Sequence, residues 1–150
     1  MRFSLLVAAT AVAAAPAELQ SRQNSCRDVH IFLAKGWNEP YPGRQGGLAG
    51  AICYGLPSCD YEDILYENAE GSDFCVAVSE GARNGLNQMN SYAARCPNSK
   101  LVISGYSQGG FIVSNILGGG GGPFSGGCTV DYNPPLDGAA AAQRKSKHIT

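Results

Sequence analysis

Residues 100–117 read Lys-Leu-Val-Ile-Ser-Gly-Tyr-Ser-Gln-Gly-Gly-Phe-Ile-Val-Ser-Asn-Ile-Leu, a stretch in which a serine separates two apolar runs. The first run is rich in β-branched residues and predicts a strand, and the second predicts a helix. Gly105, Ser107 and Gly109 match the G-x-S-x-G pattern of a nucleophile elbow, where a side chain at either glycine would collide with the strand or the helix. We therefore expect Ser107 on a strained turn with its hydroxyl exposed, and the backbone N–H of Gln108 aimed at a developing oxyanion. The competing interpretation is a glycine-rich strand-to-helix turn without chemistry.

The segments before the elbow predict an α/β fold. Two more apolar runs predict strands, and apolar residues at helical spacing predict a long helix that Ser72 or Asp73 caps and Pro97 ends. In chain order we expect a strand over 29–34, a short helix over 47–54, a strand over 61–66, a helix over 73–95 and the elbow strand over 100–105. This alternation is typical of a small parallel sheet flanked by helices. Three strands leave the elbow strand close to a sheet edge, and the glycine- and proline-rich chain after Leu117 predicts no further strand.

The first 17 residues have the plan of a secretory signal peptide: Met-Arg-Phe, an apolar stretch, and the small-residue cleavage site Ala15-Pro16-Ala17. We therefore expect a secreted, extracellular protein with a signal peptide over 1–17, one domain over 18–137, and a low-complexity, disordered tail over 138–150. A net charge of −1 and a charged fraction of 15% give no basic stripe, so nucleic acid is not an expected partner. No later segment approaches the roughly 20 apolar residues of a membrane helix, so we expect no membrane partner. We also expect a monomer.

Six cysteines follow the predicted leader, at positions 26, 53, 59, 75, 96 and 128. In an exported chain they predict disulfide bonds, and the sequence alone leaves all 15 pairings open. We expect no metal site, because the only histidines are His30 and His148 and no Cys-x-x-Cys occurs. The glycine run 118–122 is followed by proline where a dinucleotide loop needs glycine, so we expect no cofactor.

Four stretches of the chain together carry a family resemblance. They are Ser25-Cys26 followed by 28–32 (Asp-Val-His-Ile-Phe), 38–44 (Asn-Glu-Pro-Tyr-Pro-Gly-Arg), 96–102 (Cys-Pro-Asn-Ser-Lys-Leu-Val) and the elbow. On these stretches the chain resembles the cutinase and acetylxylan esterase family of secreted serine esterases, over about residues 25–137. The resemblance implies a small cap-free α/β-hydrolase, here incomplete at its C-terminus, and a Cys26–Cys96 disulfide. Pairing of Cys53 with Cys59 and of Cys75 with Cys128 is a guess from cysteine order and the family's even cysteine count.

The resemblance also implies roles for individual residues. Ser107 is the nucleophile and Gln108 supplies one oxyanion N–H. The second oxyanion donor falls at Trp37 or Asn38, through a backbone N–H or the Asn38 amide. The residues expected to bind substrate are Trp37, Asn38 and Tyr106. Three aromatic side chains either line a substrate groove or anchor loops: Trp37, Tyr41 and Phe124. The implied substrate is a plant cell-wall ester, either cutin-like polyester or acetylated xylan, cleaved through an acyl-enzyme at Ser107.

The family carries its catalytic Asp and His on loops after later strands, whereas only 43 residues follow Ser107. We therefore expect a C-terminally truncated member. The alternative to an active esterase is a catalytically inactive secreted relative, either a binding module or a non-functional fragment. A third interpretation is a minimal triad of Ser107, His148 and either Asp131 or Asp137. His30 lies within the first predicted strand and is expected to be a hydrogen-bonding residue at the edge of the core rather than a base.

Overall fold

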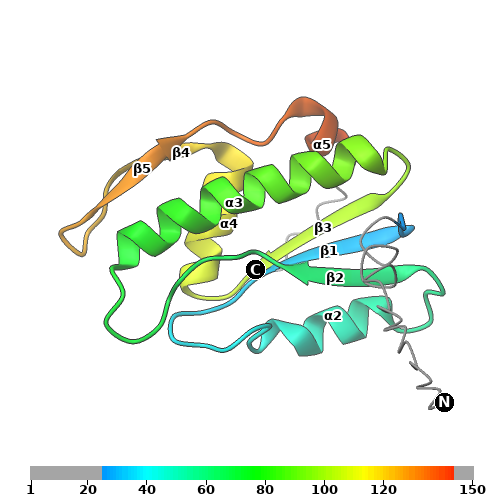
Figure 1. The fold of residues 1–150 in the computed structure, drawn as a ribbon, viewed down its shortest axis with the longest axis horizontal. Coiled ribbons are helices and arrows are strands. Elements are labelled where there is room, and N and C mark those ends of the chain that lie inside the picture. Colours follow the sequence, from blue (N-terminus) through cyan, green and yellow to red (C-terminus); the bar gives the residue numbers. More distant parts are fainter. Residues whose placement is uncertain (1–24, 144–150) are drawn as a thin grey trace, which may run out of the picture.

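A parallel sheet of three strands forms the centre of the molecule (Figure 1). The computed structural model describes residues 25–143. The strand order is β2-β1-β3, and both pairs of neighbours are parallel. In chain order the elements are β1 (Val29–Ala34), α2 (Gln45–Cys53), β2 (Cys59–Asp63), α3 (Phe74–Arg95), β3 (Lys100–Gly105), α4 (Gln108–Gly118), β4 (Gly120–Pro123), β5 (Thr129–Asn133) and α5 (Gly138–Gln143). This arrangement confirms the predicted class, an α/β fold with a small parallel sheet flanked by helices.

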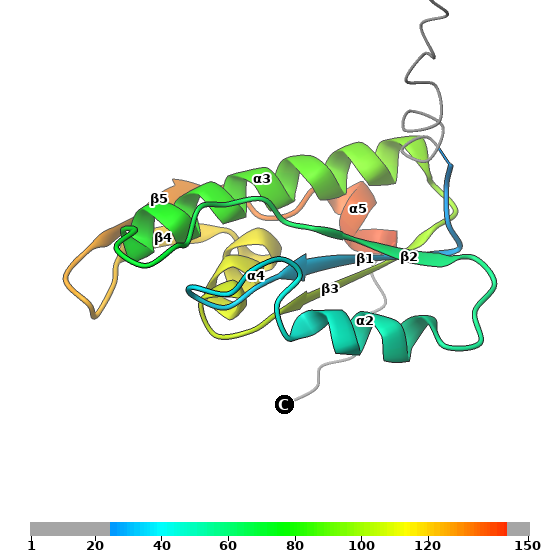
Figure 2. The same ribbon diagram turned by 60° about the horizontal axis from the view of Figure 1, so that its bottom comes forward.

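Helices cover both faces of the sheet, with α2 on one face and α3 and α4 on the other (Figure 2). The central strand β1 supplies both cores. Its Ile31 and Leu33 pack with Ala49 of α2, while Phe32 and Ala34 belong to the larger core formed with α3 and α4. Successive side chains of a strand point to opposite faces, so burial on both faces requires an unbroken apolar run. The sequence of β1 has that property.

The third strand, β3, lies at an edge of the sheet, as the sequence predicts. Among the described strands it pairs only with β1, in register from Val29 opposite Lys100 to Ala34 opposite Gly105. Because the two strands are parallel and in register, they end at the same side of the sheet. The elbow after β3 and the loop after β1, residues 35–44, therefore begin next to each other.

The long helix α3 begins at an aspartate cap. The side chain of Asp73 accepts hydrogen bonds from the backbone N–H groups of Cys75 and Val76, at 2.8 and 3.0 Å. Ser72, the other residue that the sequence offered as a cap, donates its hydroxyl to Ala69 O instead. The helix ends at Arg95, two residues before Pro97, close to the predicted bounds.

Three disulfides join the described cysteines: Cys26–Cys96, Cys53–Cys59 and Cys75–Cys128. All three predicted pairings are thus confirmed. The first ties the start of β1 to the end of α3 across a sequence separation of 70 residues. In the chain-entropy account such a bridge stabilises the fold by roughly 4 kcal/mol. The third joins the first turn of α3 to the hairpin of β4 and β5.

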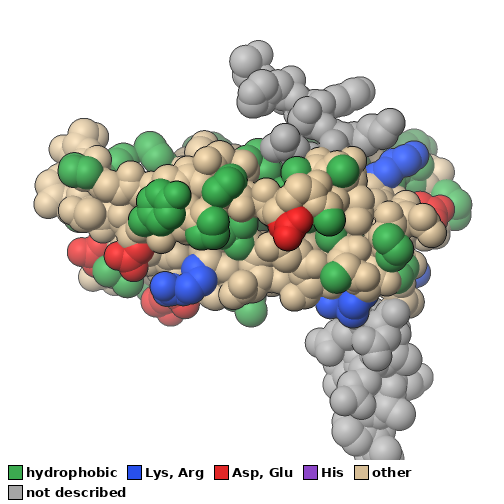
Figure 3. Space-filling model, turned by 90° about the horizontal axis from the view of Figure 1, so that it is seen from above, with side chains coloured by type: hydrophobic (Ala, Val, Ile, Leu, Met, Phe, Trp, Pro, Cys, Tyr) green, Lys and Arg blue, Asp and Glu red, His purple; other side chains and the backbone are tan. Residues whose placement is uncertain are grey.

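The chain after α4 differs from the sequence-based prediction. β4 and β5 form an antiparallel hairpin where we expected no strand, and Val130 of β5 reaches the core. Strand β4 is Gly-Gly-Gly-Pro, so it carries no apolar alternation by which a strand is recognised. Figure 3 looks down on α3, this hairpin and α5, and shows hydrophobic side chains in separate patches with few charged ones between them.

Two other segments also depart from prediction. Residues 138–143, expected to begin a disordered tail, form α5 because Ala140 is buried, Asp137 accepts the Ala139 N–H at 2.9 Å and Gln143 donates to Ala93 O. Strand β2 spans 59–63 rather than 61–66. Residues 1–24 and 144–150, with the predicted signal peptide and most of the predicted tail, lie outside the described residues. Within the described part, no helix is long and apolar enough to cross a membrane.

Candidate active site

The turn between β3 and α4 has the geometry of a nucleophile elbow. Ser107 has φ 51° and ψ −115°, a combination that L-residues rarely adopt and that costs of order 1–3 kcal/mol. The helix starts at once, since the Gly109 N–H donates to Tyr106 O at 2.8 Å and the Gly110 N–H donates to Ser107 O at 2.9 Å. Ser107 itself is exposed. The strained, exposed serine predicted from the sequence is therefore confirmed.

The two glycines of the motif are required by close backbone contacts. A Cβ at Gly105 would lie 2.2 Å from Gly109 O, and one at Gly109 would lie 2.0 Å from Ala34 O. Both distances are far below van der Waals contact. Gly110, which is outside the motif, has no such restriction, because its nearest neighbour would be 4.0 Å away. The collision that the motif predicts thus involves the helix at Gly105 and the neighbouring strand at Gly109.

Gln108 presents its backbone rather than its side chain. The side chain is fully buried, and its Nε2 donates to Phe74 O at 3.4 Å. As the first residue of α4, Gln108 has a backbone N–H without a hydrogen-bond acceptor among the described residues. An unpaired N–H at a helix N-terminus carries partial positive charge, which suits an oxyanion beside Ser107.

Tyr106 links the elbow to the loop after β1. Its ring lies against Gly36, where a Cβ would be 2.8 Å from Tyr106 Cδ1. The Arg44 guanidinium stacks 4.1 Å from the ring centroid and donates to the Tyr106 hydroxyl at 2.9 Å. Arg44 also donates to Glu39, whose carboxylate accepts the Gly36 N–H. Desolvation alone would raise the pKa of Glu39, but the hydrogen bonds from Arg44 and Gly36 hold it below its usual value.

Trp37 and Asn38 follow Gly36 in the same loop. Asn38 has φ 54° and donates its backbone N–H to Asn68 O at 2.9 Å, while Asn68 Nδ2 donates to Gly36 O at 2.6 Å. The Asn38 backbone N–H is thus already engaged. Of the second oxyanion donors suggested by the sequence, the Trp37 N–H and the Asn38 side-chain amide are left. The Trp37 side chain is half exposed.

Tyr41 is a loop anchor. Its hydroxyl donates to Tyr66 O at 2.9 Å and accepts the Tyr66 N–H at 2.8 Å. Lys35 Nζ lies 3.8 Å from the centroid of the Tyr41 ring. Burial lowers the pKa of Lys35, against the attraction of nearby carboxylates. The sequence had offered Tyr41 either as a groove residue or as a loop anchor, and its contacts with Tyr66 confirm the loop anchor. Sequence reasoning gave no role to the other supporting residues: Lys35, Glu39, Arg44, Tyr66 and Asn68. A signal was present for Glu39 and Arg44, because both lie in the stretch 38–44 that carried the resemblance.

The described residues do not bring a histidine to Ser107. His30, the one histidine among residues 25–143, contacts Asp60 Oδ1 through Nδ1 at 2.5 Å and stacks on Tyr92 at 3.8 Å between centroids. It is buried, and in register it pairs with Leu101 near the start of β3, whereas Ser107 follows the end of that strand. His30 therefore has the structural role that the sequence predicts. His148 lies outside the described residues.

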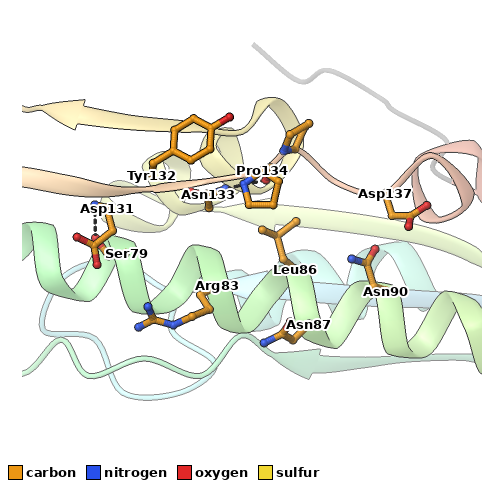
Figure 4. Close-up of a pocket in the computed structure, with 11 residues that line it drawn as sticks. Ser79, Arg83, Leu86, Asn87, Asn90, Asp131, Tyr132, Asn133, Pro134 and Asp137 are labelled. Carbon is orange, nitrogen blue, oxygen red and sulfur yellow. Dashed lines mark hydrogen bonds between the residues drawn. The ribbon is translucent and has the colours of Figure 1, made fainter.

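The two aspartates considered for a minimal triad line another part of the surface. A cavity of about 420 Å³ lies between α3 and the segment from β5 to α5, and Figure 4 shows Asp131 near Ser79 and Asp137 across from Asn90. Asp137 also caps α5. Neither carboxylate hydrogen-bonds to an elbow residue within the described part of the chain. None of the residues that line this cavity belongs to the elbow.

A parallel sheet flanked by helices, with a strained serine at the strand-to-helix turn, defines a protein of the α/β-hydrolase type. The sequence model of the cutinase family matches residues 25–144. The chain belongs to the cutinase family.

Comparisons with individual proteins agree with this family assignment. Cutinase 11 of Verticillium dahliae is 38% identical over 133 residues, which cover 84% of this chain and 45% of that protein. Acetylxylan esterase 2 of Talaromyces purpureogenus is 31% identical over 121 residues, 76% of this chain and 52% of that protein. The catalytic core domain of acetyl xylan esterase from Trichoderma reesei superposes with a TM-score of 0.72 at 26% identity, covering 81% of this chain and 62% of that one. The chain spans about half the length of the curated relatives it matches.

Proposed function

We propose that this protein is a secreted serine carboxylic-ester hydrolase of the cutinase and acetylxylan esterase type, with Ser107 as its nucleophile. The observation that carries the proposal is the elbow itself. Its strained, exposed serine is followed by a free backbone N–H at Gln108, in a chain of a family whose named relatives are esterases. Three disulfides and the predicted signal peptide support an extracellular location.

In the proposed reaction, Ser107 Oγ attacks the ester carbonyl while a base takes its proton. The Gln108 N–H, with the Trp37 N–H or the Asn38 amide, stabilises the oxyanion of the tetrahedral intermediate. Cleavage of the ester C–O bond releases the alcohol, which takes up the proton, and leaves an acyl-enzyme. Water then attacks the acyl carbon, and Ser107 is regenerated as the acid leaves. Tyr106, held by Arg44, borders this site.

The proposed substrate is a plant cell-wall ester, either a cutin-like polyester or acetylated xylan. The relatives named above are a cutinase and two acetylxylan esterases, and their names support both ester classes. We also propose that the protein acts as a monomer, without nucleic acid or membrane partners.

A second candidate is a catalytically inactive secreted relative, either a binding module or a non-functional fragment. The observation that favours this candidate is that His30, the one histidine among residues 25–143, contacts Asp60 near the start of β1 and does not lie at Ser107. A serine hydroxyl without a base is a poor nucleophile, and loss of a triad partner costs several orders of magnitude in rate.

Incubation of the 150-residue chain with p-nitrophenyl butyrate separates these candidates. We expect weak hydrolysis and a butyryl adduct on Ser107, detected by mass spectrometry, with both absent in Ser107→Ala. Absence of adduct and of Ser107-dependent hydrolysis in the parent chain would favour the inactive relative. Fast turnover that disappears in His148→Ala would establish the minimal triad as the base.

A further inference from the structure

Three phenylalanine rings from three different elements meet in one cluster. Phe74 begins α3, Phe111 lies in the first turn of α4, and Phe124 lies in the connection between β4 and β5. Phe74 stacks on Phe124 with 4.9 Å between centroids, while Phe111 packs edge-on against Phe74 at 5.7 Å and against Phe124 at 5.1 Å. We call these three residues the phenylalanine cluster.

The phenylalanine cluster adjoins the elbow through two separate links. Phe111 follows Ser107, the N-cap of α4, by four residues, so it lies one helical turn further along the helix. Helical side chains lean toward the helix N-terminus, which directs Phe111 back over the turn that begins at Ser107. Independently, Gln108 Nε2 donates to Phe74 O at 3.4 Å and ties the start of α3 to the elbow.

A small cavity, partly open to solvent and lined mainly by apolar side chains, lies within the cluster. Its volume is about 130 Å³, and besides the three rings it is lined by side chains such as Val78, Pro123 and Val130, with Asn115 as the only polar side chain. An apolar cavity of roughly 150 Å³ takes up benzene, so this space corresponds to a hydrocarbon group of about six carbons. Phe111 is 45% exposed, which leaves its ring available at the entrance.

We propose that the phenylalanine cluster binds the hydrocarbon acyl chain of the ester that Ser107 attacks. This inference rests on the proposed function and deepens it, because it selects the substrate class. An acetyl group ends one carbon beyond the carbonyl, whereas Phe111 lies one helical turn, about 5.4 Å, beyond Ser107 along α4. The chain therefore prefers esters of acids with about six or more carbons, as in cutin-like polyesters, over acetylated polysaccharide.

The Cys75–Cys128 disulfide positions the hairpin side of the phenylalanine cluster. Cys75 directly follows Phe74, and Cys128 O accepts the Phe124 N–H at 2.8 Å. The bridge thus holds the turn that carries Phe124 against the start of α3. Phe124 is a substrate-contacting residue in this account, and the two cysteines are positioning residues.

The test is a binding experiment that needs no catalysis. The 150-residue Ser107→Ala chain is titrated with methyl acetate, methyl butyrate and methyl hexanoate, and the dissociation constants are read from NMR shifts of the aromatic side chains. Burial of each methylene favours binding by about fourfold, so we expect affinity to rise about fifteenfold from butyrate to hexanoate. The second substitution Phe111→Ala should remove most of this chain-length dependence, and Phe111→Leu should keep part of it.

Tyr132→Ala is the matched control, because Tyr132 lies on the same hairpin, is 81% exposed and does not line the cavity. It should leave the chain-length dependence intact. Equal affinity for the three esters would overturn the proposal, and so would unchanged selectivity in a folded Phe111→Ala chain. Chain-length-dependent binding by a parent chain that forms no acyl adduct would count against the esterase and not against the phenylalanine cluster.

Discussion

Gly109 is the residue on which the elbow depends most. A Cβ at this position would lie 2.0 Å from Ala34 O and 2.7 Å from Lys35 O, both backbone atoms that cannot turn away. Gly109→Ala must therefore displace the end of β1 or the start of α4, and we expect it to lower the free energy of unfolding by about 3 kcal/mol, as overpacking does. Denaturant unfolding followed by circular dichroism measures the loss.

Gly110→Ala is the control for Gly109→Ala. Gly110 is also a helical glycine of α4, but a Cβ at Gly110 would meet nothing closer than 4.0 Å. Alanine has higher helix propensity, so this variant should be as stable as the parent or more stable by up to about 1 kcal/mol. Similar losses for both variants would show that the motif's second glycine has no special packing role.

Asp63 makes stability depend on pH. Burial raises the pKa of its carboxyl above the ordinary value of 3.8, the Glu62 charge adds to this and Lys35 opposes it, and Asp63 Oδ1 is buried without a hydrogen-bond partner. Between the unfolded and the raised folded pKa, the folded state binds more protons, so this carboxyl costs stability as pH rises through that window. Asp63→Asn removes the cost.

We therefore expect the unfolding free energy of Asp63→Asn, relative to that of the parent, to be higher at pH 6.5 than at pH 3.5. Urea unfolding at both pH values gives the two differences directly. A difference that stays constant, or that shrinks toward pH 6.5, would mean that attraction to Lys35 outweighs the desolvation of Asp63.

At the level of elements, the start of α3 offers two neighbouring caps of which the structure uses one. Asp73→Ala leaves the Cys75 and Val76 N–H groups without their acceptor and should cost about 1 kcal/mol of unfolding free energy. Ser72→Ala should cost less, because the Ser72 hydroxyl bonds to Ala69 O and not to the helix. Thermal unfolding of the two variants ranks them, and a larger loss in Ser72→Ala would contradict the assignment.

The elements that sequence reasoning predicted are those in which side chains carry the pattern. The β1 and β3 bounds were predicted without error because both strands are apolar and β-branched. The bounds of α3 were predicted to within one residue because its buried residues recur at helical spacing. The β4–β5 hairpin was missed because Gly119 to Gly122 all have positive φ and the pairing depends on the backbone and on the Cys75–Cys128 bridge. The alanine-rich α5 was missed because the alanine run was interpreted as low-complexity sequence, although alanine favours a helix and Asp137 caps its first turn.

In the candidate site, too, the sequence identified the residues that local pattern defines and missed those that act across the fold. Ser107 and Gln108 are identified by local sequence alone, since the elbow needs only neighbouring residues. Arg44 and Asn68 were not identified, because each acts across the fold on residues that the chain brings together only after folding. The phenylalanine cluster likewise joins three distant segments.

For the whole molecule, parallel strands decide where chemistry can occur. The loop after β1, the elbow after β3 and the start of α3 converge beyond the carboxyl ends of the strands, where open α/β sheets bind their ligands. His30, near the other end of β1, cannot join them because a strand rises about 3.3 Å per residue. The topology alone therefore separates the histidine in β1 from the serine after β3.

The Cys26–Cys96 bridge joins the start of β1 to the end of α3. Its contribution to the unfolding free energy can be tested by comparison with a bridge that closes a shorter loop. The chain-entropy relation gives roughly 4 kcal/mol for closing 70 residues and about 2 kcal/mol for closing the 6 residues of Cys53–Cys59. We expect Cys26→Ser with Cys96→Ser to lose about twice the unfolding free energy lost by Cys53→Ser with Cys59→Ser, measured in urea. Since a domain of this size is stable by only about 5–15 kcal/mol, the first pair should bring the chain close to unfolding at 37 °C. Equal losses would show that strain or residual structure in the unfolded chain, and not loop closure, sets the effect of these bridges.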